Sequence, residues 1–173
     1  MGGLLDEAIE LSKNKDNEVL FVYCGGVSEM CQFNLGGSPS LCRYCSKCTK
    51  KVIESYGVKC ESLKNYEISG NNEPKFEYEN AEELRSIKYR DVNIGLGIIS
   101  GYISATRNLT PLIDEESRKY FDAHLAQNVR MVDAIYNLID KFKPDAFHFF
   151  NGRYEEVRPI WDICHTTGLK CYI

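Results

Sequence analysis

Apolar and polar positions follow one another along the chain at two spacings, which predict alternating helices and short strands. Residues 4–13 place apolar side chains every three or four positions, which indicates an amphipathic helix. Residues 18–24 form a short apolar run that ends at Gly25 and Gly26, which is typical of a strand. By the same criteria, further helices are predicted over residues 42–56, 80–89, 92–106, 115–142 and from the turn at 151–153 to 167, and further strands over residues 58–63, 146–150 and 170–173.

Two of the predicted helices have distinctive patterns. Residues 115–142 form the longest one, with Asp114 as a good N-cap and Pro144 as its stop. Residues 92–106 intersperse glycines among isoleucines. We expect this segment to be a tightly packed helix whose glycines allow another backbone to come close.

The last part of the chain predicts a parallel sheet. The run over residues 146–150 is apolar throughout, as in a strand buried on both faces, and the helix and strand after it complete a βαβ unit. We therefore expect an α/β fold that is Rossmann-like, with a cysteine-rich loop and a mostly parallel sheet flanked by helices. Residues 18–24 and 146–150 are expected in the interior of that sheet. The length of 173 residues fits one domain, and its opening on a helix predicts a fragment of a larger protein.

Composition and charge exclude several classes of protein. The hydrophobic share of 43% and the charged share of 27% are ordinary for a globular chain and too high in apolar residues for a disordered one. No apolar stretch reaches the roughly 20 residues that span a bilayer, and no signal-peptide pattern opens the chain. The net charge of −4 argues against nonspecific nucleic-acid binding, which favours a basic surface.

Cysteines are concentrated in one short window of the chain. Cys42, Cys45 and Cys48 form two overlapping C-x2-C pairs, a spacing at which two thiolates can bind one metal ion. We expect Cys24, Cys31, Cys42 and Cys45 to converge on a structural zinc ion, with Cys48 as the spare. Two alternatives stay open: an iron–sulfur cluster, which here lacks a fourth cysteine in step, and buried thiols that bind nothing.

The tripeptide Asn151-Gly152-Arg153 directly follows the strand predicted over residues 146–150. The carboxyl ends of strands are where α/β sheets form binding sites. Gly152 permits a tight turn. Arg153, together with the amides of the next helix, would favour an anion such as a carboxylate or phosphate. The alternative is that this is only a turn, and that Arg153 pairs with Glu155 or Glu156.

Other charged and titratable residues give weaker indications. Arg107, at the end of the 92–106 helix, either complements the helix dipole or reaches the same ligand as the turn. His124 on the long helix is expected to pack or to form a hydrogen bond, and no histidine is placed to form a hydrolytic triad. The acidic stretch over residues 73–83 is interpreted as a solvated face.

Three groups of motifs follow one another between residues 19 and 173. They are Tyr23-Cys24-Gly25-Gly26 with Cys31 and Leu41-Cys42-Arg43-Tyr44-Cys45; Tyr89-Arg90-Asp91-Val92-Asn93-Ile94-Gly95-Leu96-Gly97 with Ser100 and Thr106-Arg107; and Phe150-Asn151-Gly152-Arg153-Tyr154 with Arg158-Pro159 and Gly168. In this order they resemble the amino-terminal half of a group of bacterial surface-polysaccharide glycosyltransferases that build capsule or O-antigen. The matching positions that we single out are the cysteine cluster, Arg107 and Asn151-Gly152-Arg153.

The resemblance implies the amino-terminal, acceptor-side domain of a GT-B enzyme. The full enzyme would transfer sugar from a nucleotide-sugar to a glycan or lipid-linked acceptor, in the cytoplasm or at the inner face of the membrane. The family's first strand and glycine loop are missing before Leu4, and its carboxyl-terminal donor-binding domain is missing after Ile173. We therefore expect this chain alone to be inactive, and no catalytic base is assigned.

A second interpretation stays open, in which the chain is not part of an enzyme. The cysteine window would then stabilise a non-catalytic α/β binding module through zinc and would contact a partner. A second α/β domain with a phosphate-binding glycine loop in the parent gene would favour the transferase over this module.

Overall fold

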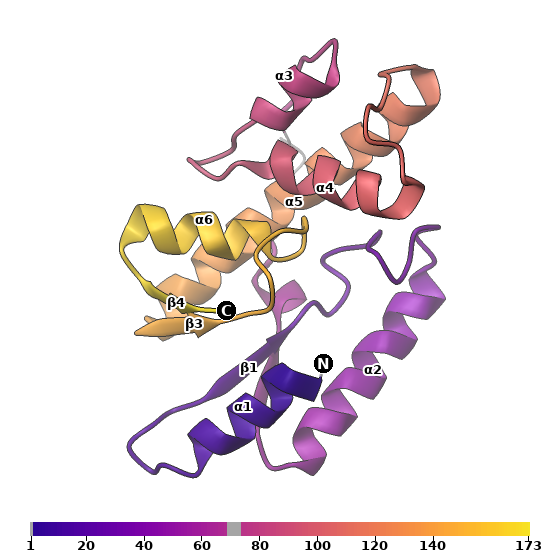
Figure 1. The fold of residues 1–173 in the computed structure, drawn as a ribbon. Helices are drawn as coiled ribbons and strands as arrows, with labels where there is room; N and C mark the ends of the chain where they lie inside the picture. The colour runs from indigo at the N-terminus through magenta and orange to yellow at the C-terminus, as the bar shows by residue number, and fades with distance from the viewer. Residues whose placement is uncertain (1, 69–73) are drawn as a thin grey trace.

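The computed structural model describes residues 2–68 and 74–173, in which helices and short strands follow one another (Figure 1). Its first part contains α1 (Gly2–Ser12), β1 (Leu20–Tyr23), α2 (Pro39–Ser55), β2 (Lys59–Ser62) and the 3-10 helix η1 (Leu63–Tyr66). Its second part contains α3 (Ala81–Ser86), α4 (Ile94–Thr106), α5 (Glu115–Phe142), β3 (Ala146–His148), α6 (Arg158–Thr167) and β4 (Lys170–Tyr172). This order of elements matches the prediction and is compatible with the α/β class.

The described strands pair in parallel, but they form two sheets rather than one. β1 pairs with β2, with Leu20 opposite Lys59, and β3 pairs with β4, with Ala146 opposite Lys170. The parallel direction is therefore confirmed. The expectation that residues 18–24 and 146–150 lie in the interior of one sheet is wrong for the described residues, because each of these strands has a single ladder partner.

β3 is shorter and less buried than its apolar sequence predicts. Ala146, Phe147 and His148 are half-buried, and Phe150 is exposed. The strand ends early because Asn151 adopts a left-handed backbone conformation, which turns the chain out of the sheet. The expectation of a strand buried along its whole length is therefore wrong.

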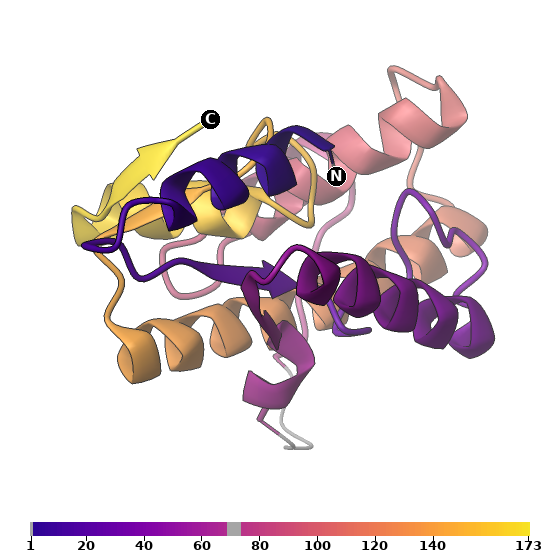
Figure 2. The ribbon, with the colours of Figure 1, turned by 90° about the horizontal axis from the view of Figure 1, so that it is seen from below.

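Helices cover both faces of β1. Val22 packs against the large core around α5, whereas Phe21 and Tyr23 pack against a smaller core that includes Leu5 of α1 and Ile53 of α2. Figure 2 shows α1 on one side of β1 and α5 on the other. The alternation of side chains along a strand sends successive residues to opposite faces, so both faces of β1 are apolar.

The long helix α5 organises the larger core. Asp114 accepts a hydrogen bond from the Ser117 amide at 2.8 Å, and the Ser117 hydroxyl accepts one from the Asp114 amide at 2.9 Å, so the start of the helix is capped as predicted. Phe121, Leu125 and Val132 are buried on its inner face with Ile98 of α4. The predicted bounds of this helix are confirmed.

The glycines of α4 bring other parts of the chain against this helix. A Cβ atom on Gly95 would lie 1.8 Å from the Leu84 carbonyl oxygen of α3, and one on Gly97 would lie 3.0 Å from the Glu155 Cα atom. Side chains at these two positions would push both neighbours away. The predicted close approach of backbone to this helix is therefore confirmed.

Candidate functional site

A hollow of about 310 Å³ lies outside the carboxyl ends of β3 and β4 and includes the predicted turn. Asn151, Gly152 and Arg153 come shortly after β3, and Ile173 comes directly after β4. Because parallel strands end at the same edge of a sheet, this is where open α/β sheets form binding sites. We call it the turn hollow, and it is lined by Leu96, Ser100, Asn151, Gly152, Arg153, Arg158, Trp161 and Ile173.

The backbone of the turn explains why glycine stands at its centre. Asn151 and Gly152 have φ values of 73° and 58°, both in the left-handed region. A Cβ atom on Gly152 would also lie 3.2 Å from the Trp161 side chain, so a larger residue would be strained and crowded. The tight turn is confirmed, and it leaves Arg153 exposed, with its guanidinium carbon 5.8 Å from the centre of the Tyr154 ring.

The helix after the turn begins later than predicted. α6 begins at Arg158, and the Arg158 amide donates a hydrogen bond to the Tyr154 carbonyl at 2.7 Å. Pro159 has no amide hydrogen, and the Ile160 amide donates to the Val157 carbonyl at 3.1 Å. The expectation of unpaired helix amides directed at the hollow is therefore wrong, because the turns before the helix satisfy them.

Two arginine side chains supply the positive charge of the turn hollow. Arg158 Nη2 lies 2.9 Å from Asp162 Oδ1, and Asp162 Oδ2 accepts a hydrogen bond from the Asn93 amide at 2.8 Å. This network fixes Arg158 and offsets its charge. Arg153 is the more exposed of the two cations and the better placed to meet an anion from solvent.

Arg107 lies at the opposite end of α4 from the residues that line the turn hollow. It ends the helix in a left-handed conformation with φ 60°, and its amide donates to the Ile103 carbonyl at 2.8 Å. Leu96 and Ser100 line the hollow, and Arg107 follows Ser100 by roughly 10 Å of helix at 1.5 Å per residue. The structure does not bring Arg107 together with the turn.

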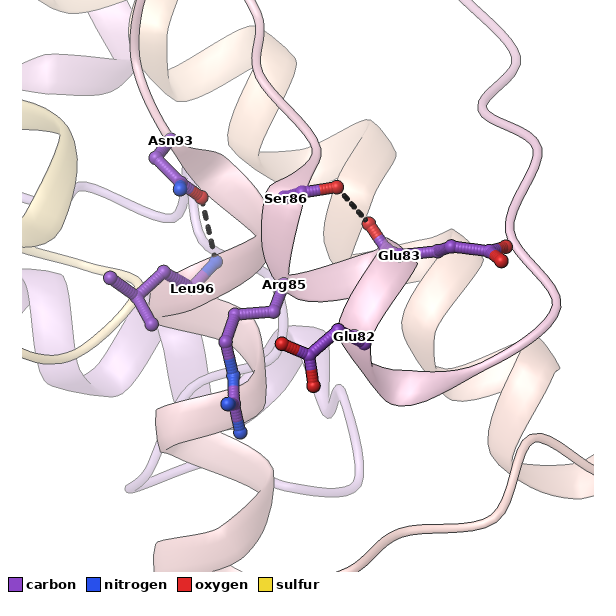
Figure 3. Close-up of a pocket in the computed structure, with 6 residues that line it drawn as sticks. All are labelled: Glu82, Glu83, Arg85, Ser86, Asn93 and Leu96. Carbon is purple, nitrogen blue, oxygen red and sulfur yellow. Dashed lines mark hydrogen bonds between the residues drawn. The ribbon is translucent and has the colours of Figure 1, made fainter.

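A second hollow of about 420 Å³ lies between α3 and the start of α4 (Figure 3). Asn93 caps α4 there by accepting a hydrogen bond from the Leu96 amide at 2.9 Å. Leu96 lines both hollows, so the two are neighbours along α4. We call this one the α3 hollow, and it is lined by Glu82, Glu83, Arg85, Ser86, Asn93 and Leu96. We did not predict this hollow from the sequence, because we interpreted the acidic stretch as a solvated face. Asn93, a residue type that favours the N-cap of a helix, could have indicated it.

A buried acid–imidazole pair lies beneath the segment that presents Arg153. His124 Nδ1 of α5 lies 2.6 Å from Glu155 Oε2, and both side chains are fully buried. Burial raises the pKa of Glu155, and the hydrogen bond from His124 opposes that shift. The Tyr120 ring stacks on the His124 ring, with 4.0 Å between the two ring centres. The hydrogen bond of His124 is as predicted, whereas the alternative in which Glu155 pairs with Arg153 is wrong, because Glu155 is buried against His124.

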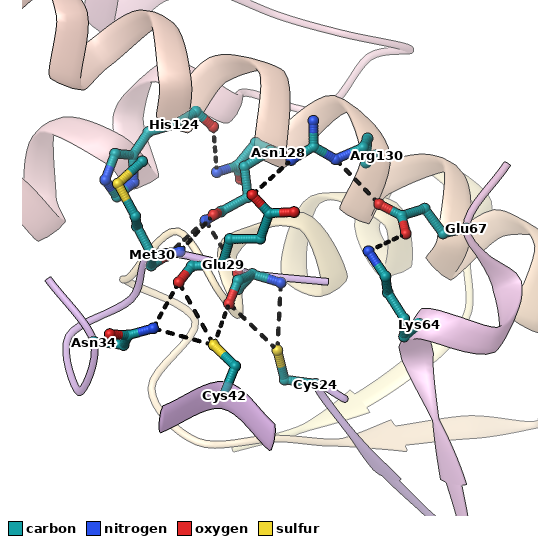
Figure 4. Close-up of polar contacts among 12 residues, drawn as sticks. Cys24, Glu29, Met30, Asn34, Cys42, Lys64, Glu67, His124, Asn128 and Arg130 are labelled. Atoms are coloured by element: carbon teal, nitrogen blue, oxygen red, sulfur yellow. Dashed lines mark hydrogen bonds and ion pairs between the residues drawn. The ribbon is translucent and has the colours of Figure 1, made fainter. Parts of the chain in front are cut away.

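The cysteine-rich loop brings two of the predicted ligands to one place (Figure 4). The Ser28 amide donates to Cys24 Sγ at 3.4 Å, and the sulfurs of Cys24 and Cys42 each lie 3.9 Å from the Ser28 carbonyl oxygen. Asn34 Nδ2 also donates to Cys42 Sγ at 3.1 Å. The loop before α2 is therefore folded around these two thiols.

The remaining cysteines do not complete a metal site in this arrangement. Burial raises the pKa of Cys31 to about 11 and also raises that of Cys24, which favours the protonated thiols. Cys45 is exposed on α2, one turn after Cys42. Within residues 2–68 and 74–173, no three His, Cys, Asp or Glu side chains are grouped to hold a metal ion. The four-cysteine zinc site therefore stays a prediction.

The same loop is fastened to the helices beside the turn hollow. Gln127 of α5 accepts a hydrogen bond from the Met30 amide at 2.9 Å and donates to the Met30 carbonyl at 2.8 Å. Gln32 donates through its side chain to the Gly101 carbonyl of α4 and through its amide to Glu156, both at 3.2 Å. The cysteine-rich loop and the segment after the turn are thus held together through the interior.

Comparison with known proteins adds no relative. No family model matches the chain, and no curated protein and no solved structure matches it either. The likeness to glycosyltransferases therefore rests on the motifs alone. No helix in the described part of the chain is long and apolar enough to cross a membrane.

Proposed function

We propose that this chain is the acceptor-side, amino-terminal domain of a GT-B glycosyltransferase that builds a bacterial surface polysaccharide. The observation that supports this most is the turn hollow. It lies outside the carboxyl ends of two parallel strands, and the Asn151-Gly152-Arg153 motif lines it. We propose that it binds a glycan or lipid-linked acceptor that carries an anionic group, either an acidic sugar or a phosphate.

The residues of the hollow match the chemistry of such an acceptor. Trp161 offers an apolar ring against which the carbon face of a sugar can pack. Asn151 offers an amide donor and acceptor for sugar hydroxyls. The guanidinium of Arg153 is permanently charged, and its planar fork of donors suits a carboxylate or phosphate. A few polar groups on a partly apolar wall are typical of small-molecule sites.

This chain would orient the acceptor, and the donor would be held elsewhere. In the full enzyme, a general base would take the proton of the acceptor hydroxyl, and positive groups would neutralise the leaving diphosphate. We assign neither role to a residue of this chain. The contribution that we propose for it is binding and orientation, which converts the reaction of two molecules into one between fixed partners.

A binding measurement on the Arg153→Ala variant tests this proposal. The probes are a tetrasaccharide that contains glucuronic acid, an uncharged tetrasaccharide of the same length and a nucleotide-sugar, each titrated by calorimetry. We expect the acidic tetrasaccharide to bind most tightly. Loss of the guanidinium should weaken that binding at least tenfold, about 1.4 kcal/mol. The nucleotide-sugar should bind more weakly than the acidic tetrasaccharide.

Arg43→Ala is the matched control, because Arg43 is also an exposed arginine but lies on α2 and does not line the hollow. Its affinity for the acidic tetrasaccharide should equal that of the unmodified chain. Equal losses in both variants would mean that only overall charge matters. Wild-type affinity in Arg153→Ala, or tightest binding of the nucleotide-sugar, would contradict the acceptor-side role.

A further inference from the structure

The helix α2 has two apolar faces, and the described part of the chain covers one of them. Ile53 is fully buried in the smaller core, where it packs with Leu5 and Ala8 of α1. A neighbouring face of the helix, about a third of a turn from Ile53, presents a second row at spacings of one, three and four residues. This row consists of Leu41, Tyr44, Cys45, Cys48 and Val52, and we call it the outer stripe.

The outer stripe is open to solvent. Tyr44 is 67% exposed, Leu41 and Val52 are each 43% exposed, and Cys45 is exposed as well. Apolar side chains in a continuous row on the outside of a helix are unusual in a protein surface without a partner. The second apolar face therefore indicates an interaction surface.

The loop before α2 carries two further exposed apolar side chains. Phe33 is 89% exposed and Leu35 is 51% exposed. Asn34, between them, is buried and donates through its side chain to the Glu29 carbonyl at 2.8 Å and to Cys42 Sγ at 3.1 Å. The loop is thus fixed to the first turn of the helix, and its two apolar side chains are held outward rather than left free.

The charge of this surface differs from that of the chain as a whole. Residues 30–53 contain the cations Arg43, Lys47, Lys50 and Lys51 and no acidic residue, whereas the chain has a net charge of −4. The acidic residues on either side are Glu29 and Glu54, and Glu54 lies 3.7 Å from Lys50 Nζ. All four cations are exposed. On a helix of 3.6 residues per turn, Lys47 and Lys51 lie along one edge of the outer stripe, whereas Arg43 and Lys50 lie farther around the helix. An exposed apolar row with basic residues beside it is typical of helices that lie in the interface of an anionic membrane.

We propose that α2 and the loop before it bind the surface of a bilayer that contains anionic lipids. The helix would lie parallel to the membrane, with Phe33, Leu35 and Tyr44 entering the headgroup region and Lys47 and Lys51 facing lipid phosphates. A second copy of this chain is a poorer occupant, because a symmetric contact would place the same cations against each other. The inference goes beyond sugar binding and does not depend on it.

Sedimentation with vesicles tests the proposal on the chain as it is. Vesicles of phosphatidylcholine alone are compared with vesicles of phosphatidylcholine and phosphatidylglycerol at 7:3. We expect at least tenfold tighter binding to the anionic vesicles and a decrease with added salt. Lys47→Gln with Lys51→Gln should weaken that binding at least tenfold, and Phe33→Asn should weaken it at least fivefold. Circular dichroism confirms that each variant is folded, as expected for exposed positions.

Matched controls separate the surface from general charge and apolarity. Lys13→Gln with Lys15→Gln removes two exposed lysines near the end of α1, and Ile68→Gln removes an exposed apolar residue after η1. Both should bind the anionic vesicles as the unmodified chain does. Equal binding to neutral and anionic vesicles, no binding to either, or equal losses in the controls would overturn the proposal. Self-association that Phe33→Asn abolishes would also overturn it in favour of a second copy. Because no sugar is present, failure here leaves the acceptor role untouched.

Discussion

At the scale of single residues, the buried His124–Glu155 pair determines how Arg153 is presented. Glu155 stands two residues after Arg153 and lies between α4 and α5, where its carboxyl group meets the imidazole at 2.6 Å. A charged group so far from water is retained only when it is paired. The pair therefore anchors the segment that forms one side of the turn hollow.

We expect this pair to make stability depend on pH. Burial raises the pKa of Glu155 above its ordinary 4.5, with a further contribution from the nearby Glu156, so the folded state keeps the proton to higher pH than the unfolded state. The stabilisation that results is present at and below pH 4.5 and is lost as the pH rises through the folded pKa. Glu155→Gln cannot ionise and still offers His124 a hydrogen-bond partner. Its stability relative to the unmodified chain should therefore increase from pH 4.5 to pH 7.5.

Urea unfolding of both proteins at several pH values between 4.5 and 7.5 measures this difference. A free energy of unfolding that changes in parallel for the two proteins would show that Glu155 does not titrate differently in the folded state. Glu115→Gln is the control for the loss of one surface carboxylate, because the side chain of Glu115 is 87% exposed and pairs with Lys119 at 2.7 Å. The effect of Glu155→Gln on the pH dependence should exceed the effect of this control.

The His124–Glu155 contact was only partly predictable from the sequence. The hydrogen bond of His124 was predictable because histidine on the inner face of a helix needs a polar partner. Its partner was not predictable, because Glu155 is distant from His124 in sequence and a glutamate is ordinarily placed at the surface. Only the packing of α4 against the 153–157 segment directs that side chain inward.

At the scale of elements, close contact between helices depends on the glycines of α4. The Gly95 amide donates to the Ile87 carbonyl at 3.2 Å, next to the end of α3, and Gly95 itself lies against the Leu84 carbonyl. Packing at this distance leaves no room for a side chain. The contact holds α3 against the start of α4, next to the α3 hollow.

We expect Gly95→Ala to destabilise the chain by about 2 kcal/mol or more, because the added methyl group would overlap backbone that cannot move alone. Gly3→Ala is the matched control, since a Cβ atom there meets nothing within 4 Å. It should be neutral or stabilising by up to about 1 kcal/mol through helix propensity. Denaturant unfolding measures both, and equal effects of the two substitutions would contradict the packing of α3 on α4.

Element bounds were predictable where they depend on local chemistry. Asp114 caps α5 and Gly168 ends α6 in a left-handed conformation, and both roles follow from residue type and position. The strands and the start of α6 were less predictable. Strand pairing depends on partners far along the chain, and the turns after Arg153 delay the helix until Arg158.

At the scale of the whole molecule, parallel connections bring separate strand ends to one edge. From this rule, the position of Asn151-Gly152-Arg153 at a hollow could be predicted from the sequence. The position of Arg107 could not, because it depends on the direction in which α4 runs. It also did not predict that the described strands divide into two sheets. The likeness to glycosyltransferases concerns this same edge, so the account depends on what binds there.

The fluorescence of Trp161 tests that claim most directly, because Trp161 is the single tryptophan of the chain and lines the turn hollow. Titration with the glucuronic-acid tetrasaccharide should change its emission in a saturable way, with the affinity that calorimetry gives. The uncharged tetrasaccharide should produce a weaker change, and Arg153→Ala should shift the curve at least tenfold to higher concentration. Binding detected by calorimetry without any change in Trp161 emission would place the sugar elsewhere and contradict the account.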